Sequence, residues 1–141
     1  MSRSLNDLDY RVRSTVFEFL ARCAEAGIPI IIVDTLRTPE EQAANIAKGV
    51  SWTTNSKHLP QAETKKSLAI DVAPFDVYQL HGPDKLKWDG SDPVWQRIGI
   101  IGEKCGLKWG GRFKPPAKPD LGHFEYYPLA QRVRDTPEVV V

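Results

Sequence analysis

Histidine and aspartate residues in this sequence stand where a metal-binding site would need them. His58 precedes the apolar run "SLAIDVAPF", and Asp71 lies in the middle of that run. His123 begins a later run, "HFEYY", and Asp120 stands three positions before it, across a bend marked by Gly122. An acid inside an apolar strand is costly unless it is paired or bound to a metal. Asp71 therefore needs a partner, and the histidines are candidates.

The three residues His58, Asp71 and His123 would supply one nitrogen or oxygen ligand each. Three protein ligands with one open position are typical of catalytic zinc, whereas a structural site usually closes the fourth position, often with cysteine. Neither Cys23 nor Cys105 lies near these segments. We expect both cysteines to be small buried residues on apolar helix faces, not a disulfide or a ligand pair.

Each of these residues also has a plainer interpretation. A histidine beside aromatic residues is most often a packed, hydrogen-bonded core residue, and Asp120 could simply form the turn ahead of Gly122. In the metal-site interpretation, Asp120 faces the metal. There a carboxylate can take a proton from an activated water and pass it to a leaving amine. Spacing alone leaves both interpretations of Asp120 open.

Capping residues and hydrophobic periodicity predict the elements that position these side chains. Helices are expected between Ser4 and Gly27, Thr38 and Gly49, and Asp92 and Gly106, each with a capping residue at its start and a glycine at its end. Strands are expected at 28–37, 68–75, 107–109 and 123–127, and the tail after them is expected to form one helical turn. This order predicts an α+β fold, with a small, mainly antiparallel sheet and helices packed on it.

Length and charge restrict the class of protein. A chain of 141 residues suits one domain, and we expect 1–141 to form a single catalytic domain. The formal charge of +1 gives no support for nucleic-acid binding. The first 20 residues are charged where a signal peptide would be apolar, and no apolar run approaches the roughly 18 residues that cross a bilayer. We expect cytoplasmic synthesis without a signal peptide and no membrane insertion.

Three ordered motifs resemble a known peptidase family. "SKH…SLAID" resembles the S-x-H…G-x-A-x-D signature of the zinc D,D- and L,D-peptidases of the VanY/VanX and hedgehog-like group. "GLKWGGRF…PDLGHFE" resembles the W-G-G…D-x-x-H-F element of its endopeptidase branch, the L-alanyl-D-glutamate peptidases of bacteriophage lysis cassettes and bacterial autolysins. "VDTLRTPEEQ" is similar to the family's strand–Arg–helix segment. The resemblance covers about residues 28–127.

The resemblance implies a role for each matching residue. His58, Asp71 and His123 match the zinc ligands, and Asp120 matches the catalytic base. Arg37 matches the residue that contacts substrate, polarises the scissile carbonyl and holds the developing oxyanion.

Further positions near the motifs are also candidates. Ser56 and Gln42 match family residues near the substrate, although either could be an ordinary surface residue. Trp109 could wall the cleft, but core packing is the plainer interpretation. Glu125 shares a strand face with His123 and either orients that ligand or forms an ordinary salt bridge. His81 matches no motif, and we expect a surface residue in a turn.

The sequence departs from the family pattern between two of the ligands. Twelve residues separate His58 from Asp71, which is longer than the usual spacing, and Ser67 replaces the signature glycine. The extra polar segment 61–66, "QAETKK", can loop out without moving the ligands, because lengthening a loop costs little. Our hypothesis is that it forms part of the cleft rim and helps to select the peptide stem; the alternative is an inert surface loop.

The resemblance implies a zinc-dependent peptidase that cleaves the L-Ala–D-Glu bond of the peptidoglycan stem peptide. We expect a monomeric phage endolysin without a separate cell-wall-binding domain, released onto the wall from the host cytoplasm. Two alternatives are a D-Ala–D-Ala carboxypeptidase and a non-catalytic zinc- or wall-binding module. Asp120 argues against the second alternative, because a domain without activity tends to lose its base.

Overall fold

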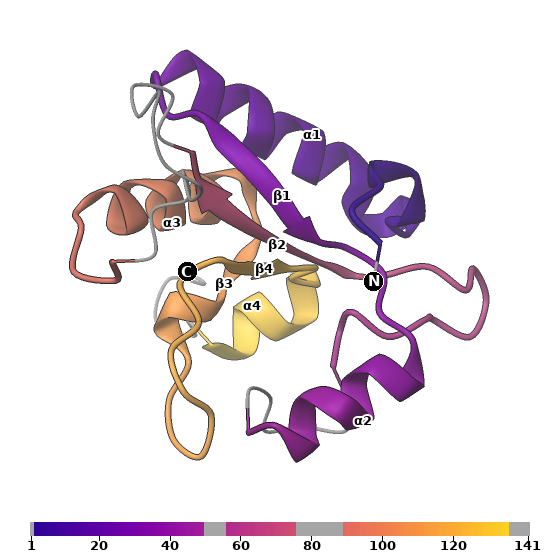
Figure 1. Ribbon diagram of the computed structural model, residues 1–141. Helices are drawn as coiled ribbons and strands as arrows, with labels where there is room; N and C mark the ends of the chain where they lie inside the picture. Colours follow the sequence, from indigo (N-terminus) through magenta and orange to yellow (C-terminus); the bar gives the residue numbers. More distant parts are fainter. Residues whose placement is uncertain (1, 50–55, 76–88, 136–141) are drawn as a thin grey trace.

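The computed structural model of the protein describes residues 2–49, 56–75 and 89–135 (Figure 1). Its α-helices are α1 (Tyr10–Glu25), α2 (Pro39–Ala47), α3 (Val94–Cys105) and α4 (Leu129–Asp135). Its strands are β1 (Ile30–Asp34), β2 (Ala69–Pro74), β3 (Lys108–Trp109) and β4 (His123–Glu125). Short 3-10 helices span Leu5–Asp7 and Gly110–Arg112. No helix in the described part of the chain is long and apolar enough to cross a membrane.

The four strands form one antiparallel sheet in the order β1-β2-β4-β3. Strand β2 lies between β1 and β4, and this arrangement sets Asp71 opposite Asp34 on one side and opposite His123 on the other. The register of β1 shifts between Ile32 and Asp34. The predicted α+β fold with a small antiparallel sheet is confirmed.

Helices α1 and α3 pack against one face of the sheet and form the core with it. The ring of Phe19 in α1 lies 4.5 Å from that of Phe124 in β4, and Gly102 in α3 faces the same ring. Along β2 and β4, the core residues Ile70 and Phe124 alternate with Asp71 and His123. Because successive strand residues point to opposite faces, the polar residues point to the face that α1 and α3 leave free.

The first two helices show one wrong boundary and one confirmed one. Ser4 caps only the short 3-10 helix, and α1 begins six residues later, with Asp9 accepting a hydrogen bond from the backbone N–H of Arg11. The predicted start was therefore wrong, because a second capping residue, Asp9, follows Ser4. The α2 boundary is confirmed, since Thr38 and Glu41 form the expected capping box.

The remaining boundaries differ modestly from the predictions. Helix α3 begins at Val94 with Pro93 as its N-cap, one residue later than predicted, and Asp92 Oδ1 accepts a hydrogen bond from the Val94 N–H at 2.9 Å. Strands β1 and β4 are shorter than predicted: β1 ends at Asp34, where its register against β2 shifts, and β4 ends at Glu125. Helix α4 is longer than the single predicted turn. His81 lies outside the described residues.

Candidate active site

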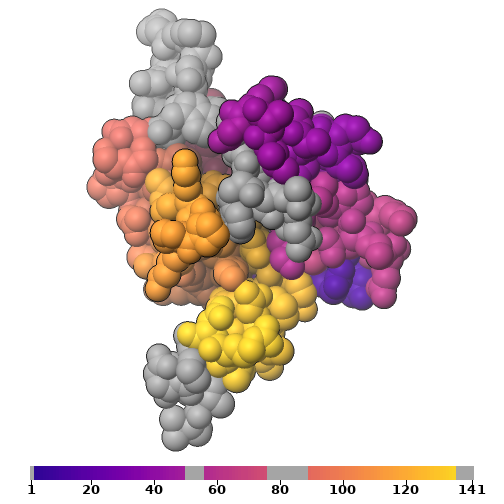
Figure 2. Space-filling model, turned by 90° about the horizontal axis from the view of Figure 1, so that it is seen from below, coloured from indigo at the N-terminus to yellow at the C-terminus, as the bar shows by residue number. Residues whose placement is uncertain are grey.

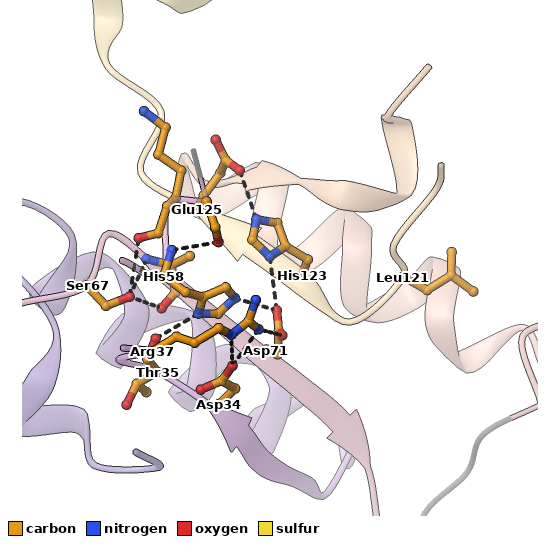
Figure 3. A network of polar contacts seen from close by, with 12 residues as sticks. Asp34, Thr35, Arg37, His58, Ser67, Asp71, Leu121, His123 and Glu125 are labelled. Atoms are coloured by element: carbon orange, nitrogen blue, oxygen red, sulfur yellow. Dashed lines mark hydrogen bonds and ion pairs between the residues drawn. The ribbon is translucent and has the colours of Figure 1, made fainter. Parts of the chain in front are cut away.

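Asp71 joins the two predicted histidine ligands at the centre of the site (Figure 3). Its Oδ1 lies 3.0 Å from Nε2 of His58 and 3.0 Å from Nδ1 of His123. The potential ligand atoms of the three residues all lie within 4.8 Å of one another. The sheet register places Asp71 and His123 together, and the loop before β2 brings in His58.

The outer nitrogen of each imidazole is already engaged. His58 Nδ1 lies 2.7 Å from the carbonyl oxygen of Thr35, and His123 Nε2 lies 2.8 Å from Oε1 of Glu125. These partners accept hydrogen bonds from the outer nitrogens, which directs Nε2 of His58 and Nδ1 of His123 towards Asp71. Metal-binding histidines are typically oriented by such a second hydrogen bond. Of the two interpretations of Glu125, the contact with His123 favours the orienting role.

Burial and charge act in opposite directions on these ligands. Burial alone would raise the pKa of Asp71, but the nearby His58 and His123 more than offset it, so the Asp71 pKa lies well below its usual range. Burial alone would lower the pKa of His123, but hydrogen bonds to Asp71 and Glu125 raise it to about 10. His123 therefore holds its proton more tightly than an ordinary histidine does. A divalent cation would replace that proton, and a His, Asp and His donor set fits zinc.

Arg37 lies beside the metal ligands and is held on two sides. Asp34 Oδ2 accepts hydrogen bonds from Arg37 Nε at 3.0 Å and Nη2 at 2.5 Å. Gln42 Oε1 accepts a hydrogen bond from Nη1 at 2.6 Å, and Nη2 lies 3.6 Å from Asp71 Oδ2. Gln42 is only 2% exposed, so its interpretation as an ordinary surface residue is wrong.

Ser56 supports a ligand of the candidate site through the backbone. Its Oγ accepts a hydrogen bond from the backbone N–H of His58 at 3.1 Å. The backbone carbonyl of His58 in turn accepts from the N–H of Arg37 at 2.9 Å. Ser56 thus helps to place both a predicted ligand and the loop beside Arg37; a direct substrate contact of Ser56 stays a prediction.

Asp120 lies in a bend that packs tightly on β3 and β2. Its backbone N–H donates to the carbonyl of Gly110 at 2.9 Å, and its carbonyl accepts from the N–H of His123 at 3.2 Å. A Cβ on Gly110 would lie 2.5 Å from the Asp120 carbonyl oxygen, and one on Gly122 would lie 2.4 Å from the carbonyl oxygen of Val72. Glycine is therefore required at both positions for the approach that brings Asp120 and His123 together.

A cleft of about 280 Å³ connects Asp120 with Asp71. The residues that line the cleft besides these two acids are Val33, Val72, Gly90, Trp95, Pro119, Leu121 and Gly122. Crowding by protein atoms, and next the charge of Asp71, raise the pKa of Asp120. The side chain is nevertheless exposed, so solvent screens part of this effect. Such an acid at the edge of a cleft is suited to exchanging protons with bound molecules.

Trp109 belongs to the core. Its side chain is 1% exposed, its Nε1 donates to the Leu121 carbonyl at 2.9 Å, and its ring fills the space over Gly99 and Gly111. The plainer interpretation is thus favoured, and we assign Trp109 no place on the cleft wall. Its hydrogen bond to Leu121 instead helps to hold the bend that carries Asp120.

The sequence reasoning missed two neighbours of the site. Asp34 is 1% exposed and binds Arg37, and the ring of Phe113 lies 5.6 Å from that of His123. Asp34 carried a usable signal, since an acid at the end of an apolar strand is the same irregularity that identified Asp71. Phe113 carried none, because its position depends on how the loop after β3 folds back.

The 61–66 segment is anchored on the N-terminal part of the chain. Thr64 Oγ1 donates to Oδ2 of Asp9 at 2.6 Å, and Lys66 Nζ donates to the carbonyl of Asn6 at 2.5 Å. Ser67 forms a parallel bridge with Leu8. The segment is therefore part of a packed contact, and its effect on the cleft stays a prediction.

Solved structures define the class of fold. The Serratia marcescens L-Ala D-Glu endopeptidase ChiX is 21% identical and aligns over 96% of this chain and 91% of its own, with a TM-score of 0.63. VanYB in complex with D-Alanine-D-Alanine is 13% identical over 94% of this chain and 78% of its own, with a TM-score of 0.54. A third structure is a mutant of the D,D-pentapeptidase VanY from a VanB-type vancomycin resistance cassette, in complex with Zn(II). It is 16% identical over 91% of this chain and 78% of its own, with a TM-score of 0.51.

The sequence then identifies the family within this class. The model of the phage L-alanyl-D-glutamate peptidase family matches residues 1–117, and the chain belongs to that family. It is therefore a peptidase of the peptidoglycan-cleaving kind, as the motifs indicated. The match ends before Asp120 and His123, so their place in the site rests on the fold. A search of curated proteins found no match.

Proposed function

We propose that this protein is a zinc-dependent endopeptidase that cleaves the L-Ala–D-Glu bond of the peptidoglycan stem and serves phage-induced host lysis. The observation that carries the proposal is the group of three donor atoms from His58, Asp71 and His123, within 4.8 Å of one another at the cleft that Asp120 lines. The Zn(II) of the VanY complex and the name of the family support the choice of metal and bond.

Zinc held by these three residues supplies a Lewis acid that lowers the pKa of water towards 7. Asp120 accepts the proton of the attacking water and delivers it to the amine of the leaving D-Glu. Arg37 donates a hydrogen bond to the scissile carbonyl oxygen, where negative charge develops. The geometry suits these roles, because Arg37 lies beside Asp71 and Asp120 shares the cleft with it.

The cleft favours an endopeptidase over a D-Ala–D-Ala carboxypeptidase. A carboxypeptidase must receive a free terminal carboxylate, which requires a positive charge or several N–H donors. Among the described residues that line the cleft there is no lysine or arginine, and the charged ones are Asp71 and Asp120. Asp120 would repel a terminal carboxylate, whereas an internal amide carries no charge. The nearby Arg37 is bound to Asp34 and Gln42, and its remaining N–H groups are assigned to the scissile carbonyl. The alternative of a non-catalytic zinc- or wall-binding module gives no role to Asp120 or to Arg37, which Asp34 and Gln42 hold beside the metal ligands.

The described residues support one catalytic unit around a single sheet, and we propose that it acts as a monomer. Its partner is the stem peptide itself, reached through the cleft. It acts on the wall after release from the cytoplasm of the host. Sedimentation of the zinc-loaded protein, which measures its molecular mass in solution, tests whether it is a monomer.

Digestion of purified peptidoglycan tests the proposed function. We expect the zinc-loaded protein to produce new L-Ala carboxyl termini and new D-Glu amino termini, which mass spectrometry identifies. Asp120→Ala, which leaves the three metal ligands in place, is the matched control and should produce neither. Release of free D-Ala as the only product would assign the carboxypeptidase activity instead.

A further inference from the structure

We propose that Asp34 is a positioning residue that holds Arg37 away from the metal ligand Asp71 and orients it towards the substrate. The inference rests on the proposed function for the role of Arg37. It adds Asp34, which lies within the segment "VDTLRTPEEQ" but to which the resemblance assigned no role. Its basis is the set of contacts around one guanidinium group, of which those between Arg37 and the two acids Asp34 and Asp71 are shown in Figure 3.

The guanidinium of Arg37 has five N–H groups, and three of them are bound to two neighbours. Asp34 Oδ2 accepts from Nε at 3.0 Å and from Nη2 at 2.5 Å, and Gln42 Oε1 accepts from Nη1 at 2.6 Å. One N–H therefore remains on each terminal nitrogen. The Arg37 side chain is 12% exposed, so the group is fixed in the protein but not sealed from the cleft.

Asp71 competes with Asp34 for the same guanidinium. Asp71 Oδ2 lies 3.6 Å from Arg37 Nη2, which is beyond a good hydrogen bond but close enough for attraction. The two acids face each other across the β1–β2 pairing. Without the Asp34 carboxylate, Arg37 would close onto Asp71, withdraw electron density from a metal ligand and leave the position from which it reaches the carbonyl.

The burial of Asp34 indicates that its carboxylate serves this purpose. Its side chain is 2% exposed, and within the described residues Oδ1 is buried without a hydrogen-bond partner. Burying a half-satisfied carboxylate is unfavourable, and a well-packed apolar residue would often be as stable there. Because stability alone would not favour an acid at position 34, we expect the Asp34 carboxylate to serve another function.

The sequence contains a matched control for this inference. Asp9 is likewise buried, and it accepts hydrogen bonds from Nε and Nη2 of Arg11, both at 3.0 Å. This pair holds the start of α1 and the segment around Thr64, and it contacts none of the candidate site residues. Asp34→Asn and Asp9→Asn therefore each weaken one buried aspartate–arginine fork, only one of which lies at the site.

We expect Asp34→Asn to lower kcat on a stem peptide by about 10- to 100-fold, with KM changed by less than about 3-fold, because a preorganised donor is displaced. Zinc affinity, measured by competition with a chelator, should fall by about 10-fold as Arg37 approaches Asp71. The NMR signal of the Arg37 Nε–H should broaden or exchange faster with water. Asp9→Asn should leave kcat, zinc affinity and the Arg37 signal unchanged.

A double variant separates positioning from general damage. If Asp34 acts through Arg37, Asp34→Asn should have no further effect on kcat in an Arg37→Ala protein; an equal loss in both backgrounds would overturn the inference. Should Asp34→Asn fail to fold, Asp34→Glu, whose longer side chain displaces the guanidinium, takes its place under the same criteria. If the wild type cleaves no stem peptide, the proposed function fails, whereas an unchanged Arg37 signal and zinc affinity in Asp34→Asn would overturn the positioning role alone.

Discussion

One carboxylate oxygen of Asp71 lies between the facing nitrogens of two imidazoles, and a proton on either nitrogen must leave when a metal binds there. Asp71 Oδ1 lies 3.0 Å from both His58 Nε2 and His123 Nδ1. An imidazole nitrogen that donates to this oxygen cannot also donate electrons to a metal. Zinc binding and protonation of the site therefore exclude each other.

We expect zinc binding to release about one proton and to strengthen as pH rises from about 6 to 9. The pKa of His123 is raised to about 10 in the metal-free fold. The bound proton thus stabilises that fold below the ordinary pKa of about 6.5. This stabilisation disappears as pH rises towards 10, so zinc meets less competition. Calorimetric titration of the protein with zinc, in two buffers of different ionisation enthalpy, measures how many protons are released on binding. A zinc affinity independent of pH would contradict this.

Substitution of the two acids in the cleft should have different consequences. Asp120→Ala should keep the fold and the zinc but lose about 10²- to 10⁴-fold in turnover, since a general base is removed. Asp71→Ala should lose the metal, because Asp71 contacts both histidines. Zinc content and turnover of each variant separate the two roles. Near-complete turnover of Asp120→Ala would rule out Asp120 as the base.

At the scale of the elements, the helix signals predicted most of the framework. Thr38 and Glu41 identified the start of α2, and Gly106, with a φ of 98°, ended α3 as expected. Local capping has a local cause, so the sequence reveals it. The start of α1 was misplaced because Ser4 and Asp9 are both good caps, and only the packing of Leu8 in the core selects between them.

The predicted ligands Asp71 and His123 meet because β2 and β4 pair in a register that sets them opposite each other. The family resemblance implied a shared ligand set, but the sequence did not predict this pairing. The contacts of Arg37 with Asp34 and Gln42 were not predictable either. They depend on the turn between β1 and α2, whose geometry no periodicity describes. Side-chain partners across such turns become visible only in the folded structure.

Gly110→Ala should disturb the bend that carries Asp120. The added Cβ would lie 2.5 Å from the Asp120 carbonyl oxygen and 2.9 Å from His123 Cβ, so the bend must move. We expect turnover to fall by at least about 10-fold, since small displacements of catalytic groups are costly. Gly27→Ala is the control: it meets no atom within 4 Å and should cost about 1–2 kcal/mol of stability through its positive φ, with turnover unchanged. Equal turnover in the two variants would contradict this account.

Removing the 61–66 segment should affect stability as well as the cleft. Thr64→Val deletes the hydrogen bond to buried Asp9 and should lower the free energy of unfolding by about 1–3 kcal/mol without changing the cleavage products. Deletion of the whole segment should keep zinc and, if the segment borders the cleft, broaden the range of stems that are cleaved. Denaturation and product analysis of both variants separate anchoring from selection. Identical products from the deletion variant would favour the inert-loop alternative.

The whole molecule divides its work between the two faces of one sheet. Helices α1 and α3 bury one face, and the opposite face carries Asp71 and His123. Seen from below, α2 (purple) and the segment after β3 (orange) both lie on the face turned towards the viewer (Figure 2). Arg37 stands immediately before α2, and Asp120 lies at the end of the segment after β3. The two proposed catalytic groups thus approach the metal ligands from different elements.

Titration of the metal-free protein with zinc, while cleavage of a defined stem peptide is followed by mass spectrometry, tests the central claim most directly. We predict that activity is absent without metal and reaches a plateau at about one equivalent of zinc, as a single three-ligand site requires. The products should be one fragment ending in L-Ala and one beginning with D-Glu. Full activity in the metal-free protein, or release of D-Ala alone at the plateau, would contradict the account.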